Sequence, residues 1–168
     1  MNKDLSKIKH MAGLIMAVLF IIISLYSSQY DRSGVSDDVA VKKVVDGDTV
    51  ILTNDEKVRY IGIDTPETKH PKKEIQCFGK EAAARNKELV EGKKVKLERD
   101  ISERDKYGRL LRYVYLEDST FVNLLLVKEG YARASTYPPD IKHQNDFLEA
   151  EREARGNNRG LWNAEACN

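Results

Sequence analysis

The stretch VAVKKVVDGDTVIL, residues 39–52, constrains the fold of this chain more than any other. It is rich in valine, which favours strands, and Asp46-Gly47 interrupts it with a strong signal for a tight hairpin turn. Three further segments have strand-like patterns: KVRYIGI (57–63), KKVKLER (93–99) and RLLRYVYL (109–116). The sequence therefore predicts five short strands, of which the first two form a hairpin.

Three helical segments interleave with these strands. We expect helices over residues 78–91, 120–129 and 140–155, with Gly92, Gly130 and Gly156 as their ends. Ser119 or Thr120 is the expected cap of the second helix. Pro138-Pro139-Asp140 opens the third, whose inward residues are Ile141, Phe147, Leu148 and Ala154. Three strands, a helix, two strands and two helices predict an α+β domain, a five-stranded OB-like barrel carrying three helices.

An apolar segment precedes this domain. Lys3, Lys7 and Lys9 come before an uncharged, mostly apolar run over residues 11–26. This order is typical of a secretory signal. The run is slightly shorter than the ~20 residues of a membrane span, and no small-x-small cleavage pattern follows it. A cleaved signal and an uncleaved anchor helix both fit, and either one exports the domain.

The expected organisation is a signal peptide or membrane anchor (1–30), a linker (31–38) and a folded domain (39–168). The whole chain has 28 basic and 27 acidic residues, a net charge of +1. Residues 1–30 contain three lysines and one aspartate, so the rest has a net charge of −1. Such a balance excludes attraction of polyanions by bulk charge. Any handling of nucleic acid must depend on locally placed arginine, lysine and metal.

Two acidic motifs lie at strand junctions: DGDT (46–49) and DTPE (64–67). The second has the spacing of a helix cap or a solvated turn, but no apolar period follows it. If the second and third strands pair, both motifs lie at one edge of the barrel. Their carboxylates, with a backbone carbonyl, then describe a Ca2+ or Mg2+ site. Arg59 and Arg109 lie on strands beside this edge, and guanidinium groups suit a phosphate.

The segments VVDGDTV, VRYIGIDTPET and RDKYGRLLRYVY, in this order and at these spacings, closely resemble the thermonuclease (staphylococcal nuclease-like) family. The resemblance covers about residues 39–162. It implies an OB-fold barrel with three helices, which agrees with the strand and helix pattern. It also implies a hydrolase: a Ca2+-dependent, largely sequence-nonspecific endonuclease. The substrates are DNA, preferably single-stranded, and RNA, and the products end in 3′-phosphate.

The resemblance assigns roles to the acidic motifs. Asp48 and Asp64 match the carboxylates that hold Ca2+, and Thr65 matches the residue that lends its backbone carbonyl. Glu67 matches the carboxylate proposed to activate the attacking water. These four residues are the expected metal and base set.

The resemblance also assigns substrate contacts. Arg59 and Arg109 match the pair that binds the scissile phosphate, and Lys106 and Tyr107 match positions that touch a terminal phosphate of the bound nucleotide. The base-stacking tyrosine of the family falls on Thr136 in ungapped register, and Tyr137 is the residue beside it. Three more lysines form either a basic flap near the site or a solvated loop: Lys69, Lys72 and Lys73.

Cys77 and Cys167 lie far apart in the sequence, which excludes a CxxC metal or redox motif. In an exported protein such a pair tends to oxidise, so we expect a disulfide between them, with two unrelated thiols as the alternative. We expect a monomer, secreted or anchored to the membrane with the domain outside. The rival function is a non-catalytic, membrane-anchored OB module that binds nucleic acid or protein.

Overall fold

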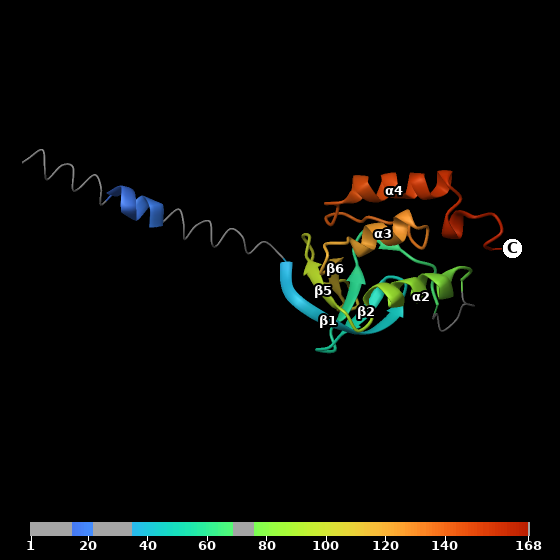
Figure 1. Cartoon of the computed structure of the whole chain (residues 1–168), viewed down its shortest axis with the longest axis horizontal. Helices are drawn as coiled ribbons and strands as arrows, with labels where there is room; N and C mark the ends of the chain where they lie inside the picture. The colour runs from blue at the N-terminus through green and yellow to red at the C-terminus, as the bar shows by residue number, and fades with distance from the viewer. Residues whose placement is uncertain (1–14, 22–34, 69–75, 168) are drawn as a thin grey trace, which may run out of the picture. The chain divides into compact units, whose positions relative to one another are not determined.

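The computed structural model describes residues 15–21, 35–68 and 76–167 (Figure 1). The chain divides into two units, residues 1–33 and 34–168. Most of the expected signal or anchor segment lies outside the described residues, and its described part, 15–21, is helical. Within the described ranges, no helix has the length and apolarity needed to cross a membrane.

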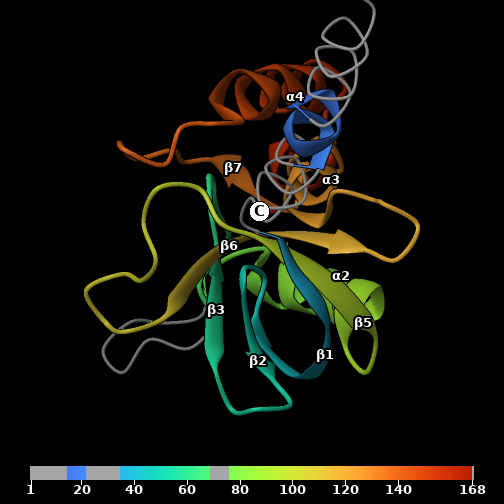
Figure 2. The same ribbon diagram turned by 90° about the vertical axis from the view of Figure 1, so that its left-hand side faces the viewer.

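Five strands of the second unit close into a barrel, as expected from the sequence (Figure 2). Their order around the barrel is β1 (Val35–Asp46), β2 (Thr49–Leu52), β3 (Lys57–Tyr60), β6 (Leu110–Leu116) and β5 (Lys94–Glu98). Neighbouring strands are antiparallel except β3 and β6, whose pairing is parallel. The hairpin expected at Asp46-Gly47 joins β1 to β2.

Alternating apolar residues fill the barrel. On β2, β3 and β5 the buried side chains recur at every second position, because successive side chains of a strand point to opposite faces. These inward residues are Val50, Leu52, Val58, Tyr60, Val95 and Leu97, all under 4% exposed. Burial of one such side chain stabilises the fold by about 1.5–3 kcal/mol. The period-2 pattern of the sequence therefore reports the barrel interior directly.

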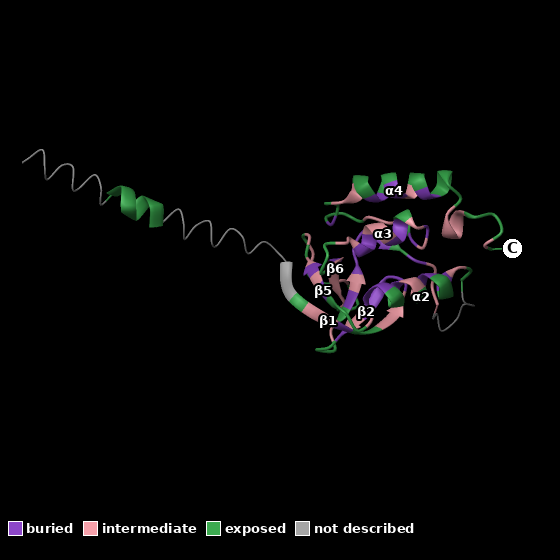
Figure 3. Ribbon diagram, viewed as in Figure 1, coloured by how far each residue is buried: buried purple, intermediate pink, exposed green. Residues whose placement is uncertain are grey.

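Three helices cover the barrel: α2 (Gly79–Val90), α3 (Val122–Lys128) and α4 (Gln144–Gly156). α2 packs against β1, and α3 lies between β6 and α4. Figure 3 shows α4 exposed along its outer side and buried towards α3. The expected cap of α3 is wrong, because Phe121 occupies the cap position and its side chain accepts no capping hydrogen bond. Asp118 instead accepts the backbone N–H of Thr120 (2.9 Å) in a turn before the helix.

The expected start of the third helix is also wrong. Pro138 and Pro139 are joined by a cis peptide bond, and α4 begins only at Gln144. Asp140 does not cap this helix, since its carboxylate accepts the backbone N–H groups of Ile101 (3.0 Å) and Ser102 (2.7 Å). Two of the four expected inward residues are exposed instead, Ile141 at 47% and Leu148 at 41%, whereas Phe147 and Ala154 are buried.

A second, two-stranded sheet that the sequence did not predict pairs β4 (Ile63–Asp64) with β7 (Arg133–Ala134). Strands of two residues carry no period that sequence analysis can detect. The pairing sets Asp64 opposite Arg133, and the backbone N–H of Ser135, just after β7, donates to the carbonyl of Gly62 (2.8 Å), so the segment that follows β7 lies beside the turn that precedes β4.

The expected disulfide joins Cys77, just before α2, to Cys167. The last turn, a 3-10 helix over Gly160–Trp162, precedes Cys167. Trp162 stacks beneath the guanidinium of Arg155 on α4, whose central carbon lies 4.0 Å from the ring centroid. The C-terminal tail is therefore tied both to α4 and to the start of α2.

Candidate active site

Asp48 lies at the end of the β1–β2 hairpin and is only 4% exposed. One of its oxygens, Oδ2, accepts hydrogen bonds from the backbone N–H (2.9 Å) and the hydroxyl (3.0 Å) of Thr65. The other accepts a hydrogen bond from the Thr49 hydroxyl (3.1 Å). The DGDT and DTPE motifs therefore meet at one edge of the barrel, as the pairing of β2 with β3 predicts.

Arg59 lies between the two carboxylates of this corner. It stands opposite Thr49 in the β2–β3 ladder, and its guanidinium forms ion pairs with Asp48 and Asp64, the latter at 2.8 Å. A further hydrogen bond joins its Nη2 to the carbonyl of Ile63 (3.2 Å). Burial lowers the pKa of Arg59 from its ordinary value, and the Asp64 carboxylate opposes that shift. One half-buried cation thus pairs with two carboxylates, and the three groups together keep a net charge of −1.

Asp46, the first residue of the DGDT motif, also belongs to this cluster, although sequence analysis gave it no role of its own in the site. Burial raises the pKa of Asp46, and the positive charge of Arg59 opposes the rise. Its carbonyl accepts a hydrogen bond from the buried Asn86 on α2 (3.0 Å), and Asn86 also accepts one from the Tyr60 hydroxyl (3.0 Å). These bonds fix the hairpin turn against α2. The motif DGDT contained the signal for Asp46, because it carries two acidic residues at one strand junction.

Arg109 approaches the same corner from the start of β6. Its Nε donates to Asp105 Oδ2 (2.7 Å), and Asp105 Oδ1 accepts the backbone N–H groups of Arg109 (3.0 Å) and Tyr107 (2.9 Å). Burial pushes the pKa of Asp105 upwards, but the hydrogen bonds from Arg109 outweigh it and the pKa lies below its ordinary value. Arg109 Nη1 lies 3.5 Å from the Thr49 hydroxyl. Asp105, which sequence analysis missed, therefore orients Arg109 towards the hairpin.

A cavity of about 580 Å³ lies beside the two arginines. Among the predicted site residues, it is lined by Arg59, Arg109, Lys106 and Tyr107. Tyr137 also lines it, whereas Thr136 does not, so the alternative register is the one that brings a tyrosine to the cavity. Tyr107 and Tyr137 are 73% and 74% exposed. The cavity thus combines cationic groups with two accessible aromatic rings.

Glu67 lies outside this cavity, at the base of the loop that follows Asp64. Its backbone N–H donates to the side chain of Gln76 (2.9 Å), and its carbonyl accepts the backbone N–H of Gln76 (3.0 Å). A neighbouring cavity of about 340 Å³ is lined by Asp64, Thr65, Gln76 and both cysteines, among others. The three lysines of the expected flap, Lys69, Lys72 and Lys73, lie outside the described residues.

The corner formed by Asp48, Asp64 and Thr65 carries oxygen donors of the type that hard divalent cations take. Across residues 15–21, 35–68 and 76–167, no group of three or more His, Cys, Asp or Glu side chains is arranged to hold a metal ion. The donors here are two carboxylates and the carbonyl of Thr65, and such oxygens suit Ca2+ or Mg2+ rather than zinc. In this structure both carboxylates pair with the guanidinium of Arg59.

Gly47 permits the close contact between the hairpin and the DTPE loop. A Cβ atom at this position would lie 2.7 Å from three side-chain atoms of Thr65. Real Cβ atoms essentially never come so close to another heavy atom. A residue larger than glycine would therefore push Thr65 away from Asp48.

Known proteins are similar in sequence to most of this chain. A family model described as "Staphylococcal nuclease homologue" matches residues 57–164. The chain is 45% identical over 125 residues to a thermonuclease of Staphylococcus intermedius, covering 73% of this chain and 74% of that protein. It is 39% identical over 162 residues to a thermonuclease of Staphylococcus hyicus, covering 89% and 95%. It is 47% identical over 130 residues to the SPbeta prophage-derived endonuclease YokF of Bacillus subtilis, covering 74% of this chain but 44% of that longer protein.

Proposed function

This chain belongs to the staphylococcal nuclease family and is a nuclease, and we propose that it is a Ca2+-dependent endonuclease that cleaves nucleic acid strands with little regard to base sequence. One observation carries the proposal. Arg59 and Arg109 converge on one cavity, and Arg59 pairs there with two carboxylates, those of Asp48 and Asp64. Phosphodiester hydrolysis needs this combination of positive charge and hard oxygen ligands.

The two arginines bind the scissile phosphate. β3 and β6 pair in parallel, with Arg59 opposite Leu111, so Arg59 and Arg109 are delivered by neighbouring strands. Their planar forks suit two phosphate oxygens each. Negative charge grows on these oxygens in the transition state, and preorganised donors stabilise it. Asp105 keeps Arg109 in place through its bond to Nε.

Asp48, Asp64 and the Thr65 carbonyl would hold the cation. When bound, Ca2+ would offset the negative charge of the phosphate. Glu67, on the same loop, orients the attacking water and accepts its proton. Attack in line with the 5′-oxygen breaks the phosphorus–oxygen bond, that oxygen takes a proton from solvent, and the product strand ends in 3′-phosphate.

Single-stranded DNA and RNA are the proposed substrates. Tyr107 and Tyr137 present exposed rings at the cavity, and stacking on aromatic rings tolerates any base. A strand whose bases are unpaired gives these rings access. We further propose that the protein acts as a monomer outside the cell, secreted or anchored by its N-terminal segment. The disulfide supports this location, since such bonds persist in oxidising compartments.

The test is incubation of the purified protein with denatured DNA, native DNA and RNA, with Ca2+, with Mg2+ and with a Ca2+ chelator. We expect rapid cleavage of denatured DNA with Ca2+ and none with chelator, and 3′-phosphate ends on the products. Arg109→Lys is the matched variant for the role of the guanidinium, because it keeps the positive charge but loses the planar fork that binds two phosphate oxygens. Binding of DNA without cleavage under every metal condition would support the rival function, a non-catalytic module, and would overturn the proposal.

A further inference from the structure

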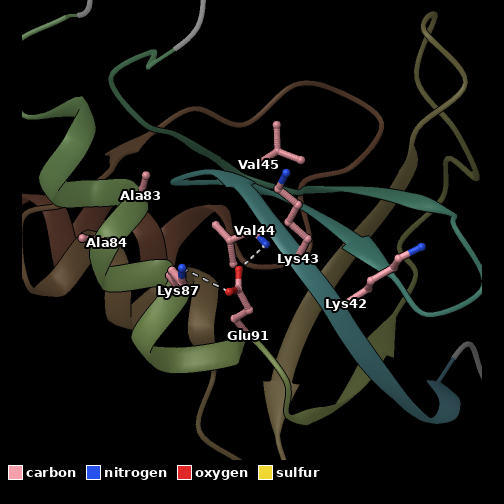
Figure 4. Close-up of a pocket in the computed structure, with 8 residues that line it drawn as sticks. All are labelled: Lys42, Lys43, Val44, Val45, Ala83, Ala84, Lys87 and Glu91. Carbon is pink, nitrogen blue, oxygen red and sulfur yellow. Dashed lines mark hydrogen bonds and ion pairs between the residues drawn. The ribbon is translucent and has the colours of Figure 1, made fainter.

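A groove of about 490 Å³ lies between β1 and α2, away from the two arginines (Figure 4). The helix side is formed by Ala83 and Ala84, whose small side chains leave the space open. The other lining residues include three lysines: Lys42, Lys43 and Lys87. The groove is thus a basic surface on a domain that sequence analysis showed to have almost no net charge.

An irregularity in the pairing of β1 exposes two successive lysines, Lys42 and Lys43, to solvent. In the β1–β2 ladder Val41 pairs with Leu52 but Lys43 pairs with Ile51, so Lys42 is an extra residue. Regular alternation would turn one of two successive residues inward, whereas a bulge re-aims the side chains that follow it. Lys42 and Lys43 are both exposed as a result.

The lysines differ in the charges around them. Lys42 pairs with Asp55 (2.6 Å) and Lys87 pairs with Glu91 (3.3 Å). Lys43 and the nearby Lys57 have no ion pair within the described part of the chain. These last two lysines therefore carry positive charge that no ion pair of the described chain engages, although Asp46 lines a cavity with both of them and Glu91 lines the groove with Lys43.

The groove is continuous with the candidate active site. A third cavity of about 340 Å³ shares Lys43 and Val45 with the groove and Arg109 with the site cavity, and it adds Lys57. Lys43 and Lys57 both pair with Ile51, from opposite sides of β2. They therefore lie in one row across three strands, about 10 Å apart at a strand spacing of about 4.8 Å. A line of lysines leads from Arg109 through this row to Lys87.

We propose that this lysine line (Lys57, Lys43 and Lys87) binds backbone phosphates of the polynucleotide strand on one side of the bond being cleaved. The proposal rests on the nuclease function above. Phosphate contacts by lysine fix a strand without reading its sequence, and they supply affinity that the nearly neutral domain lacks as a whole. The line therefore favours a long strand over a short one and leaves the chemistry to the arginines.

The test compares the double variant K43Q/K57Q with the control K80Q/K94Q, which removes the same charge from exposed positions outside the three cavities. Binding of a single-stranded DNA of about 20 nucleotides is followed by fluorescence anisotropy in chelator at about 50 and about 200 mM salt. Each lost phosphate contact reduces the salt slope by about 0.7. Raising the salt should therefore cost the wild type and the control about sevenfold more affinity than K43Q/K57Q.

Cleavage with Ca2+ provides the second readout. K43Q/K57Q should have a lower kcat/KM on the long strand and an unchanged kcat/KM on a thymidine dinucleotide, whose single phosphodiester does not reach the lysine line. Equal losses on both substrates, or binding equal to that of K80Q/K94Q, would overturn the proposal. Failure of the wild type to cleave either substrate would instead refute the nuclease function, and the anisotropy comparison would still decide whether the lysine line binds a strand.

Discussion

Gly47→Ala should damage both the stability of the domain and its cation site. The new Cβ would lie 2.7 Å from Cβ, Cγ2 and Oγ1 of Thr65, whereas ordinary carbon contacts begin at about 3.5 Å. Thr65 must therefore move by roughly 1 Å, and a β-branched side chain has few other rotamers to adopt. Such a movement breaks at least one of its two hydrogen bonds to the buried Asp48.

The magnitude follows from these contacts. Overpacking costs about 1–3 kcal/mol, and a lost hydrogen bond to a charged group costs about 1.5–3 kcal/mol. Partial relaxation leaves an expected loss of about 2–4 kcal/mol in the free energy of unfolding, measured by urea denaturation. Displacement of Thr65 should also weaken Ca2+ binding about 10- to 100-fold by calorimetry, as changes beside metal ligands do.

Two comparisons make this prediction refutable. Gly156→Ala is the matched control, because nothing lies within 4 Å of its Cβ position at the end of α4, and it should leave stability unchanged or slightly raised. Thr65→Gly removes all three crowded atoms, so adding Gly47→Ala to it should cost less than about 1 kcal/mol. If Gly47→Ala cost the same in both backgrounds, the steric explanation would be wrong.

Three further predictions concern the site and the tail. Arg109→Lys should lower kcat by about 10²–10³ with little change in KM, because lysine lacks the planar guanidinium fork. Asp105→Asn should lower kcat by about 10-fold, because it removes only the carboxylate that orients Arg109. Near-normal kcat in Arg109→Lys would exclude this residue from the site. Asp64→Asn should reduce Ca2+ affinity and activity together, measured by calorimetry and by Ca2+ titration of cleavage; unchanged affinity would refute its role as a ligand. Cys77→Ser with Cys167→Ser should lower the free energy of unfolding by about 2–4 kcal/mol; two free thiols in the intact mass of freshly isolated protein would contradict the bond.

The barrel was predictable because its strands bury alternate residues. The segments 57–63, 93–99 and 109–116 each contain a barrel strand, and the Asp-Gly turn stands where β1 meets β2. Local signals failed where a distant segment competed for the same group. Asp140 is a residue type that commonly caps helices, yet its carboxylate accepts hydrogen bonds from the backbone N–H groups of Ile101 and Ser102. The sequence around Pro138-Pro139 does not indicate this contact with a distant segment.

The residues of the candidate site also fall into those that local sequence signals predict and those that only the fold brings together. The meeting of the two acidic motifs was predictable because both stand at strand ends in the sequence, and Arg59 was recognisable on the strand that precedes Asp64. Asp105 was not recognised, although it lies four residues before Arg109. Its role depends on the turn that aims both oxygens at Arg109 and at the backbone, and that turn is a property of the folded loop.

The disulfide was predicted correctly, but its position next to the candidate site was not. Sequence analysis paired the cysteines from the expected compartment, after their spacing had excluded a CxxC motif. In the structure Cys77 follows Gln76, which closes the loop of Glu67 with two hydrogen bonds, and both cysteines line a cavity with Asp64 and Thr65. A bond that fixes Cys77 therefore also restricts Gln76 and, through its hydrogen bonds, the backbone of Glu67, the proposed base. Loss of the bond should for this reason lower kcat at temperatures where the domain remains folded, because Glu67 then spends less time in the orientation that catalysis requires.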